Sequence, residues 1–390
     1  MNQLAADITD IFRTKFQRRP LLVQSPGRVN LIGEHTDYNE GFVLPAAVDK
    51  HIMFGFAPND GTTARLYSVD MEQEFSWDLT ATDYPKSALG WPDYIMGCVD
   101  QLRQAGYEVS GFDCVFGGTI PIGAGMSSSA ALEGGTLFGL TQLFTLPMDK
   151  LTMVKLGQKA ENEFVGVQCG IMDQFANIYS RADTVFKLDC RSLEYEYYPF
   201  TRDDLKIVLC DTQVRRELAG SEYNVRRSQC EEGVALLQQY DPEIASLRDV
   251  NREMLQERKN EFDPVVYSRC EYVIEENNRV NQACQDLEND DFAAFGTRMY
   301  QSHEGLKDKY EVSSKELDLL VEITEQMEGV LGARMMGAGF GGCTINLVQT
   351  DAIEAFTTTI SERYNEQMEQ DALFYETTIT EGVHKLLPEE

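Results

Sequence analysis

Fifteen consecutive residues near the N-terminus carry a high density of groups that bind polar ligands. The segment Ser25–Asn39 holds one arginine, one glutamate, one aspartate, one histidine and two asparagines beside a Pro-Gly pair. A carboxylate accepts two hydrogen bonds at once, so Glu34 and Asp37 each suit a pair of neighbouring hydroxyls, and His35 can donate or accept. Arg28 presents a planar fork of donors that fits a phosphate or a carboxylate. The segment therefore predicts a polyol site next to an anion.

A simpler explanation is a polar turn on the surface. The acidic and amide side chains would then bond to nearby backbone, and Arg28 would pair with Glu34 in solvent. Three apolar residues, Val29, Leu31 and Ile32, alternate with the polar groups. This pattern favours a buried segment over a solvated one.

A second motif, Gly117–Glu133, lies between an apolar strand and a helix. Its glycines let backbone approach an anion, and the three consecutive serines at 127–129 add hydroxyl donors. A helix that starts there directs unpaired N–H groups and a partial positive charge at the same point. These features predict a phosphate cradle, although the Gly-Lys pair of a P-loop is absent from the chain. The alternative is a flexible turn with a serine cap at a helix start.

A third glycine-rich run, Gly337–Gly342, matches the pattern G-x-G-x-x-G. The residues that follow, Cys343–Val348, have the apolar pattern of a strand, whereas a dinucleotide fold requires a helix at that point. Two interpretations remain: a tight corner between two strands, or a wall of a ligand site.

Two acidic residues lie between the second and third motifs. Asp173 is the one acid in the apolar-flanked segment Cys169–Phe175, where a carboxylate could accept the proton of a hydroxyl nucleophile. The alternative is a carboxylate in the first turn of a helix. Glu161 lies in a charged helical stretch and could bind magnesium or face solvent, and its sequence context favours solvent.

The composition excludes several classes of protein. Of the 390 residues, 43% are hydrophobic, which is typical of a globular protein. The net charge of −30 opposes binding to nucleic acid or to anionic membranes. The chain has no run of about 20 apolar residues and no signal-peptide pattern at its start. Nine scattered cysteines without a C-x-x-C pair indicate neither a zinc site nor a disulfide framework. We expect a cytoplasmic protein.

Apolar periodicity predicts alternating strands and helices. The expected strands are 21–24, 42–48, 51–57, 64–68, 112–116, 184–188, 206–209, 333–336 and 343–348, with the second to fourth forming an antiparallel run. Helices are expected at 4–16, 91–104 and 353–363 and over most of 217–327. The weakest seam is the acidic, aromatic stretch 189–204, which predicts two domains, 1–195 and 196–390.

The three motifs, in this order and spacing, are similar to the three signatures of the GHMP small-molecule kinases. The run Gly27–Asn39 closely resembles the galactokinase signature of that family, and the resemblance covers nearly the whole chain. It implies a mixed α/β and α+β fold of two domains, with the active site in the cleft between them. The N-terminal domain would be α/β and the C-terminal domain α+β.

The resemblance implies that ATP, with Mg²⁺, phosphorylates the anomeric hydroxyl of α-D-galactose to give galactose 1-phosphate, the first step of the Leloir pathway. Asp173 and Arg28 match the catalytic pair. Asp173 would take or hold the O1 proton, and Arg28 would stabilise the transferring phosphoryl group and keep Asp173 ionised. The positions that match galactose contacts are Glu34, His35, Asp37, Gly170 and Tyr223.

The nucleotide and metal positions follow from the same resemblance. The loop that matches the phosphate-binding loop consists of Gly123, Ala124, Gly125, Met126, Ser127, Ser128 and Ser129. Ser129 and Glu161 match magnesium ligands. Trp91 and Tyr94 resemble residues of the adenine pocket, or else form a helix face packed in the core. The implied partners are galactose and ATP, without nucleic acid or membrane, and we expect a monomer.

Two positions depart from the family pattern. Met126 replaces the common leucine, a swap that conserves volume, and Ala338 replaces a glycine, which weakens the case for ligand contact at that corner. Two other functions remain open: the same chemistry on N-acetylgalactosamine or arabinose, or a non-catalytic sensor of galactose and ATP. Such sensors lack residues within the serine loop, whereas Ser127–Ala131 is complete here.

Overall fold

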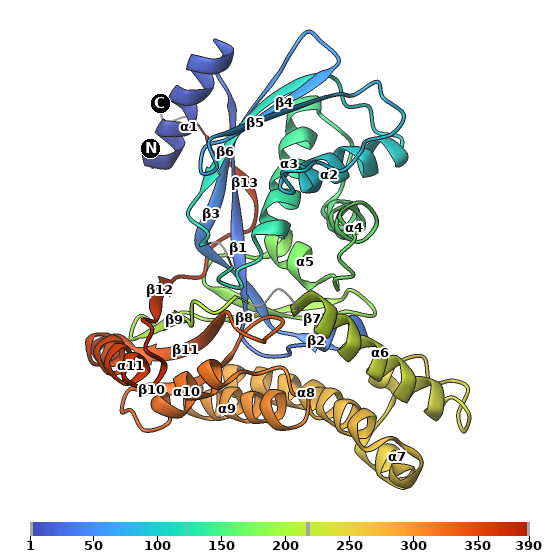
Figure 1. The fold of residues 1–390 in the computed structure, drawn as a ribbon, viewed down its shortest axis with the longest axis vertical. Coiled ribbons are helices and arrows are strands. Elements are labelled where there is room, and N and C mark those ends of the chain that lie inside the picture. Colours follow the sequence, from blue (N-terminus) through green and yellow to red (C-terminus); the bar gives the residue numbers. More distant parts are fainter. Residues whose placement is uncertain (1–2, 122, 216–218, 388–390) are drawn as a thin grey trace.

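The N-terminal half of the chain is built around a six-stranded sheet. The computed structural model describes residues 3–121, 123–215 and 219–387. The strand order is β13-β1-β3-β6-β4-β5, and only β4 and β6 run parallel to each other (Figure 1). The strands are β1 (Leu21–Asn30), β3 (Pro45–Pro58), β4 (Thr63–Ser68), β5 (Gln73–Asp78), β6 (Phe112–Gly118) and β13 (His384–Lys385).

Helices cover both faces of this sheet. Helix α1 (Gln3–Phe16) lies on one face, and the other carries α2 (Pro92–Gln104), α3 (Ser128–Phe144), α4 (Lys150–Lys159) and α5 (Met172–Tyr179). Successive residues of a strand point to opposite faces. On β3, Met53 therefore packs in the cluster of α1, whereas Phe54 and Phe56 belong to the larger core under α2–α5.

Helix α3 lies unusually close to β3 because it presents glycines to the strand. A Cβ atom on Gly135 would lie 2.3 Å from the Phe54 ring, and one on Gly139 would lie 2.2 Å from the Phe56 ring. Only glycine leaves room for this approach. The contact holds the middle of α3, a helix that begins within the serine-rich motif, against the sheet.

The C-terminal half contains a four-stranded antiparallel sheet and most of the helices. The sheet order is β10-β11-β9-β12, with β9 (Leu205–Asp211), β10 (Val330–Met335), β11 (Cys343–Gln349) and β12 (Leu373–Thr377). The helices are α6 (Ala219–Leu237), α7 (Arg252–Glu257), α8 (Pro264–Glu288), α9 (Phe292–Asp308), α10 (Lys315–Thr324) and α11 (Ile353–Met368). A small sheet of β2 (Phe42–Val43), β7 (Thr184–Asp189) and β8 (Tyr195–Pro199) lies between the two halves in Figure 1.

One hydrophobic cluster joins the two halves. Val29 and Leu31 at the end of β1 pack in the same buried cluster as Ile207 of β9, Ile345 of β11 and Phe295 of α9. The alternating apolar residues of the first motif are therefore core residues. This outcome rules out the solvated turn that the sequence left open.

The mixed α/β architecture expected from the sequence is confirmed, and most of the predicted elements are present. The antiparallel run was wrong: residues 45–58 form the single strand β3, and β6 separates it from β4. The sequence pattern could not show this insertion, since β6 comes more than 40 residues later in the chain. The predicted helical start at residue 217 lies outside the described residues. The domain division at 195/196 falls at the first residue of β8, which pairs with β7, and it stays a prediction.

Within the part of the chain that the structure describes, none of the helices combines the length and the apolar character that crossing a bilayer requires. All nine cysteines are free thiols.

Replacing Gly135 by valine tests the close packing of α3. The new side chain would overlap the Phe54 ring, so we expect the free energy of unfolding to fall by about 1–3 kcal/mol. Urea denaturation measures this change. The control is Gln142→Val, which places the same side chain on an exposed position of α3. Equal losses in the two variants would contradict the packing argument.

Candidate active site

Two cavities meet at Arg28. The first, called the loop cavity here, has a volume of about 410 Å³ and is lined by the serine-glycine loop 123–129 and the glycine corner 337–342. The second, called the acidic cavity, has a volume of about 390 Å³. The residues predicted to bind the sugar line it, namely Glu34, His35, Asp37, Gly170 and Tyr223, together with the predicted base Asp173. Arg28, Gly337 and Ala338 line both cavities.

Arg28 and Asp173 form a two-pronged ion pair at this junction. Strand β1 carries Arg28, and the first turn of α5 carries Asp173. The guanidinium donates from Nε to Oδ1 at 2.6 Å and from Nη2 to Oδ2 at 2.8 Å. It also donates to the carbonyl oxygen of Gly125, and the Ser127 hydroxyl donates to Asp173 Oδ2. Asp173 is thus both a first-turn carboxylate and a cavity residue, so its two sequence interpretations are compatible.

The carboxylates around Arg28 fix its charge. Burial opposes the cationic form, but Asp173, Glu34 and Asp37 outweigh it and raise the pKa of Arg28. Arg28 is only 6% exposed. The junction therefore holds a permanent cation between a carboxylate and the loop cavity.

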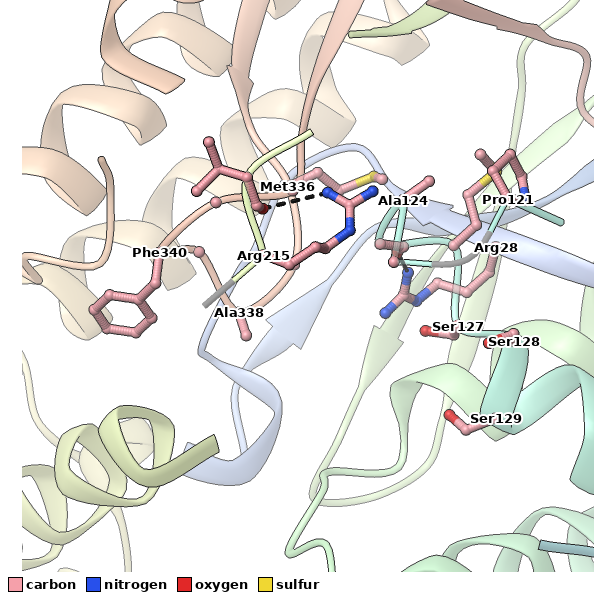
Figure 2. A pocket seen from close by; sticks show the side chains of 18 of the residues that line it. Arg28, Pro121, Ala124, Ser127, Ser128, Ser129, Arg215, Met336, Ala338 and Phe340 are labelled. Carbon is pink, nitrogen blue, oxygen red and sulfur yellow. Dashed lines mark hydrogen bonds between the residues drawn. The ribbon is translucent and has the colours of Figure 1, made fainter. Parts of the chain in front are cut away.

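The loop cavity has the features of an anion site (Figure 2). Helix α3 begins at Ser128, and its cap residue Ser127 has φ of 51° and makes no side-chain bond to the first turn. The hydroxyl of Ser127 turns to Asp173 instead, so that it does not cap the N–H groups at the start of α3. Figure 2 shows the serines and Arg28 on one side of the cavity, with Met336, Ala338 and Phe340 on the other. Donors and helix dipole together suit phosphate oxygens.

The glycine corner fulfils both of its sequence interpretations. It connects β10 to β11, and it also lines the two cavities. Gly337 donates its N–H to Glu34 Oε1 at 2.8 Å. Ala338 lines both cavities despite the methyl group that argued against contact with a ligand.

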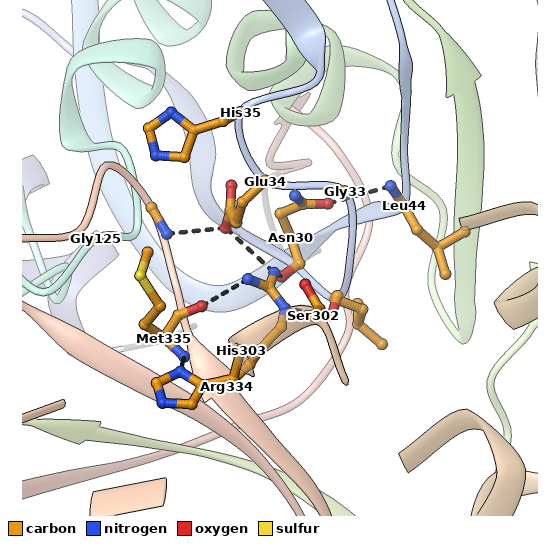
Figure 3. Close-up of polar contacts among 12 residues, drawn as sticks. Asn30, Gly33, Glu34, His35, Leu44, Gly125, Ser302, His303, Arg334 and Met335 are labelled. Carbon is orange, nitrogen blue, oxygen red and sulfur yellow. Dashed lines mark hydrogen bonds and ion pairs between the residues drawn. The ribbon is translucent and has the colours of Figure 1, made fainter. Parts of the chain in front are cut away.

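Glu34 is held in place by a buried arginine (Figure 3). Its Oε1 atom accepts from Arg334 Nη2 at 3.2 Å as well as from Gly337. Arg334 has no exposed surface and also donates to the carbonyl oxygens of Leu31, Asn30 and Met335. Within the described residues no donor contacts Glu34 Oε2, which leaves that oxygen for a ligand hydroxyl.

Sequence reasoning missed Arg334. The only signal was a charged residue inside the apolar strand that precedes the glycine run. A cation there needs acceptors in the core, but the pattern does not say which carboxylate supplies them.

His35 lies neutral in an aromatic cluster. Burial is the main reason that its pKa falls to about 4. The Nε2 atom lies 3.3 Å from the Ala338 carbonyl oxygen and must donate to it, because a carbonyl oxygen can only accept. A neutral imidazole has one N–H, so Nδ1 accepts from the Tyr38 hydroxyl at 2.7 Å. The Tyr223 ring of α6 lies 5.5 Å from the His35 ring, which brings this residue to the cavity as predicted.

Gly170 leaves the space that the carboxylate of Asp37 occupies. A Cβ atom on Gly170 would lie 1.9 Å from Asp37 Oδ2, so no other residue fits there without displacing the carboxylate. Burial, together with the charge of Asp173, raises the pKa of Asp37 to about 7. Asp37 is thus a costly charge that a ligand with hydroxyl donors would stabilise.

Glu161 does not face solvent, contrary to the preference stated from its sequence context. It is 6% exposed and lies in a π-helical turn, η2 (Ala160–Val165), a distortion common at functional sites. Burial and the charge of Asp173 raise the pKa of Glu161 to about 7, and the nearby hydroxyl of Ser129 is one of the groups that oppose this rise. Ser129 lines the loop cavity and Glu161 the acidic cavity, so this pair is a second bridge between them.

This pair fits magnesium. Among the described residues, no group of three or more His, Cys, Asp and Glu side chains is placed to hold a metal ion. Mg²⁺ needs only one or two protein ligands when phosphate and water oxygens complete its octahedron, and it prefers oxygen. The hydroxyl of Ser129 and the carboxylate of Glu161, which face neighbouring cavities, satisfy that requirement. Two buried oxygens nearby, Glu133 Oε1 and Gln174 Oε1, have no hydrogen-bond partner within the part of the chain that the structure describes.

The two residues predicted for the adenine pocket differ in position. Tyr94 lines the loop cavity. Trp91 is not among its lining residues: the indole packs edge-on against Phe116 and donates to Gln73 Oε1 at 2.8 Å. The structure favours the packing alternative for Trp91, and its role as an adenine contact stays a prediction.

Comparison with known proteins identifies the family. Residues 10–58 match the galactokinase galactose-binding signature, residues 93–181 the GHMP kinases N terminal domain and residues 283–366 the GHMP kinases C terminal model. The chain is 42% identical to the galactokinase of Exiguobacterium sibiricum over 93% of each chain, and 39% identical to that of Roseiflexus sp. over 97% of each.

Solved structures agree. The crystal structure of Lactococcus lactis galactokinase complexed with galactose is 36% identical and superposes with a TM-score of 0.93, covering 98% of this chain and 99% of that one. The mevalonate kinase of Methanococcus jannaschii is 18% identical with a TM-score of 0.64, over 93% of this chain and 98% of that one, and it shares the fold.

Replacing Asp37 by asparagine tests the buried charge of the acidic cavity. The folded chain keeps the proton of Asp37 up to about pH 7, whereas the unfolded chain releases it near pH 4. Because the folded state binds more protons in this window, ionisation destabilises the fold increasingly from pH 4 to pH 7. The free energy of unfolding of Asp37→Asn, relative to the parent chain, is therefore expected to rise over that range and then level off.

Urea denaturation across this pH range makes the measurement. In an Asp173→Asn background the rise should be smaller, since Asp173 is one cause of the raised pKa of Asp37. A difference between Asp37→Asn and the parent that does not change with pH would contradict the assignment.

Proposed function

Because the chain belongs to the galactokinase family of the GHMP kinases, we propose that it transfers the terminal phosphoryl group of ATP to the anomeric hydroxyl of α-D-galactose. The products are galactose 1-phosphate and ADP, and the reaction is the first step of the Leloir pathway. The observation that carries the proposal is the pair of cavities that share Arg28. One has the donors that suit a phosphate and the other the carboxylates that suit a polyol, so a phosphate and a sugar hydroxyl would meet at this cation.

Asp173 acts on the nucleophile in this proposal. A sugar hydroxyl must lose its proton as it attacks phosphorus, and a carboxylate within hydrogen-bond reach accepts it. The bidentate contact from Arg28 holds both oxygens of Asp173 at the junction of the two cavities, where a sugar hydroxyl would lie. The same guanidinium faces the loop cavity and offsets the negative charge that spreads over the phosphoryl oxygens.

The remaining carboxylates hold the sugar. Glu34 Oε2 and the Asp37 carboxylate accept from hydroxyls, while neutral His35 and the ring of Tyr223 close the cavity around the sugar ring. The backbone of Gly170 lets the sugar reach Asp37. These contacts form when the sugar binds, before the transition state is reached. They therefore lower the KM for galactose more than they raise kcat.

The loop cavity holds the nucleotide. The N–H groups at the start of α3 and the hydroxyls of the serine loop bind the phosphates. Ser129 and Glu161 would hold Mg²⁺, and a bound Mg²⁺ would neutralise part of the negative charge of the phosphate groups. Tyr94 lies where it can contact the nucleotide. The monomeric state and the cytoplasmic location expected from the sequence stay predictions.

The substitution Asp173→Asn removes the base but keeps the shape of the side chain. We expect kcat to fall by about 10²–10⁴ while the fold is retained. Arg28→Met should have a loss of similar size, since the phosphoryl group and Asp173 both lose their cation. Steady-state kinetics with circular dichroism as a folding check measures these effects.

The chain offers a matched control. Arg65 donates to Asp113 from Nε at 2.6 Å and from Nη2 at 2.7 Å, which is the same ion-pair geometry at a site outside both cavities. Asp113→Asn should keep its kcat at temperatures where it is folded. If Asp173→Asn is as active as Asp113→Asn, the catalytic assignment is wrong.

An ADP-release assay across a panel of sugars tests the substrate. We expect turnover with galactose and at least a tenfold lower kcat/KM with N-acetylgalactosamine, glucose and arabinose. Fastest turnover with another member of the panel would assign the chain to that sugar. Tight binding of galactose and ATP without any turnover would identify a sensor.

A further inference from the structure

Gln174 is a buried amide that joins two carboxyl groups. Its side chain has no exposed surface. The Nε2 atom donates to Glu161 Oε2 at 2.8 Å and to Glu133 Oε2 at 2.9 Å. Glu133 also has no exposed surface and lies on α3. None of the three motifs points to this bridge, and the mechanism above makes no use of it.

The bridge ties together three elements that supply groups to the junction. Gln174 follows Asp173 in the first turn of α5, and Glu161 belongs to the π-helical turn η2. Glu133 lies one helical turn beyond Ser129 on α3. The amide therefore sets the position of Glu161 relative to the helices that carry Ser129 and Asp173.

An amide is the side chain that this position requires. An NH₂ group has two hydrogens, one for each carboxyl oxygen, and it carries no charge. A carboxylate at position 174 would offer no donor when ionised. An apolar side chain there would remove the donor that Glu133 shares with Glu161 and leave Glu161, among the described residues, with only the weak thiol donor of Cys169. Gln174 contacts only the Oε2 atom of Glu161, which leaves the other oxygen available to a cation.

We propose that Gln174, anchored by Glu133, is the positioning residue that holds Glu161 in the orientation needed to bind a divalent cation beside Ser129. This inference rests on the proposed role of Ser129 and Glu161 as cation ligands. Removing a residue that hydrogen-bonds to a metal ligand typically lowers the metal affinity by about 10–100-fold.

The test is Gln174→Met, which keeps the length of the side chain and removes both donors. The probe is Mn²⁺, titrated by electron paramagnetic resonance into the full chain saturated with the β,γ-imido analogue of ATP. We expect the dissociation constant for Mn²⁺ to rise at least tenfold. Galactose affinity, measured by calorimetry without metal, should change less than twofold, because Gln174 does not line the acidic cavity.

A neighbouring glutamine provides the matched control. Gln101 of α2 is also buried, and its Nε2 donates at 3.1 Å to Glu163 Oε2 on the same π-helical turn. Gln101→Met therefore removes an amide-carboxylate bond from the same turn without touching Glu161. It should leave the Mn²⁺ dissociation constant within twofold of the parent value. Equal losses in the two glutamine variants would show a general effect of stability and overturn the proposal.

Two further variants separate the possible failures. Glu161→Gln should weaken Mn²⁺ binding more than Gln174→Met does, and if it has no effect the proposed cation ligand itself is wrong. Should Glu161→Gln weaken binding while Gln174→Met does not, the positioning role alone is rejected. If Gln174→Met does not fold, Glu133→Leu removes the other end of the bridge, and an unchanged Mn²⁺ affinity in that variant also rejects the proposal.

Discussion

The buried guanidinium of Arg334 is the interaction on which the site depends. It comes from the C-terminal sheet, and it donates to the backbone of Asn30 and Leu31 at the end of β1 and to the Glu34 carboxylate. A charge without exposed surface is tolerated only when acceptors surround it. The two halves of the chain must therefore meet in one arrangement for Arg334 to be satisfied, and that arrangement brings the glycine corner against the first motif.

The same arrangement concentrates negative charge. Glu34, Asp37, Glu161 and Asp173 lie around one cavity, with Arg28 as the cation at its junction with the loop cavity. Burial and mutual repulsion raise the pKa values of Asp37 and Glu161. Holding these carboxylates close together in a buried place is electrostatically unfavourable, and groups that donate hydrogen bonds or bring a cation would offset that cost. The binding of a polyol and a metal-bound phosphate that we propose depends on this local charge distribution more than on the −30 net charge of the chain.

Local sequence patterns predicted elements well and their partners poorly. The spacing of apolar residues along α2, β6 and α11 is contained within each segment, so the sequence predicted these elements directly. The pairing of β4 with β6, the burial of Glu161 and the role of Gln174 depend on contacts with residues far along the chain. Trp91 shows the same limit, because a helix-start aromatic looks alike whether it packs on Phe116 or lines a cavity.

The sequence by itself determined the chemistry available at the site: a cation, carboxylates suited to a polyol, a serine-glycine loop and a candidate base, in motifs dense enough to identify their family. Only the tertiary structure decided which of these groups meet. Arg28 and Asp173 are 145 positions apart, and Arg334 lies 300 positions from Glu34. Their pairing is set by burial of charge in a core shared by both halves, a constraint that no local pattern of residues contains.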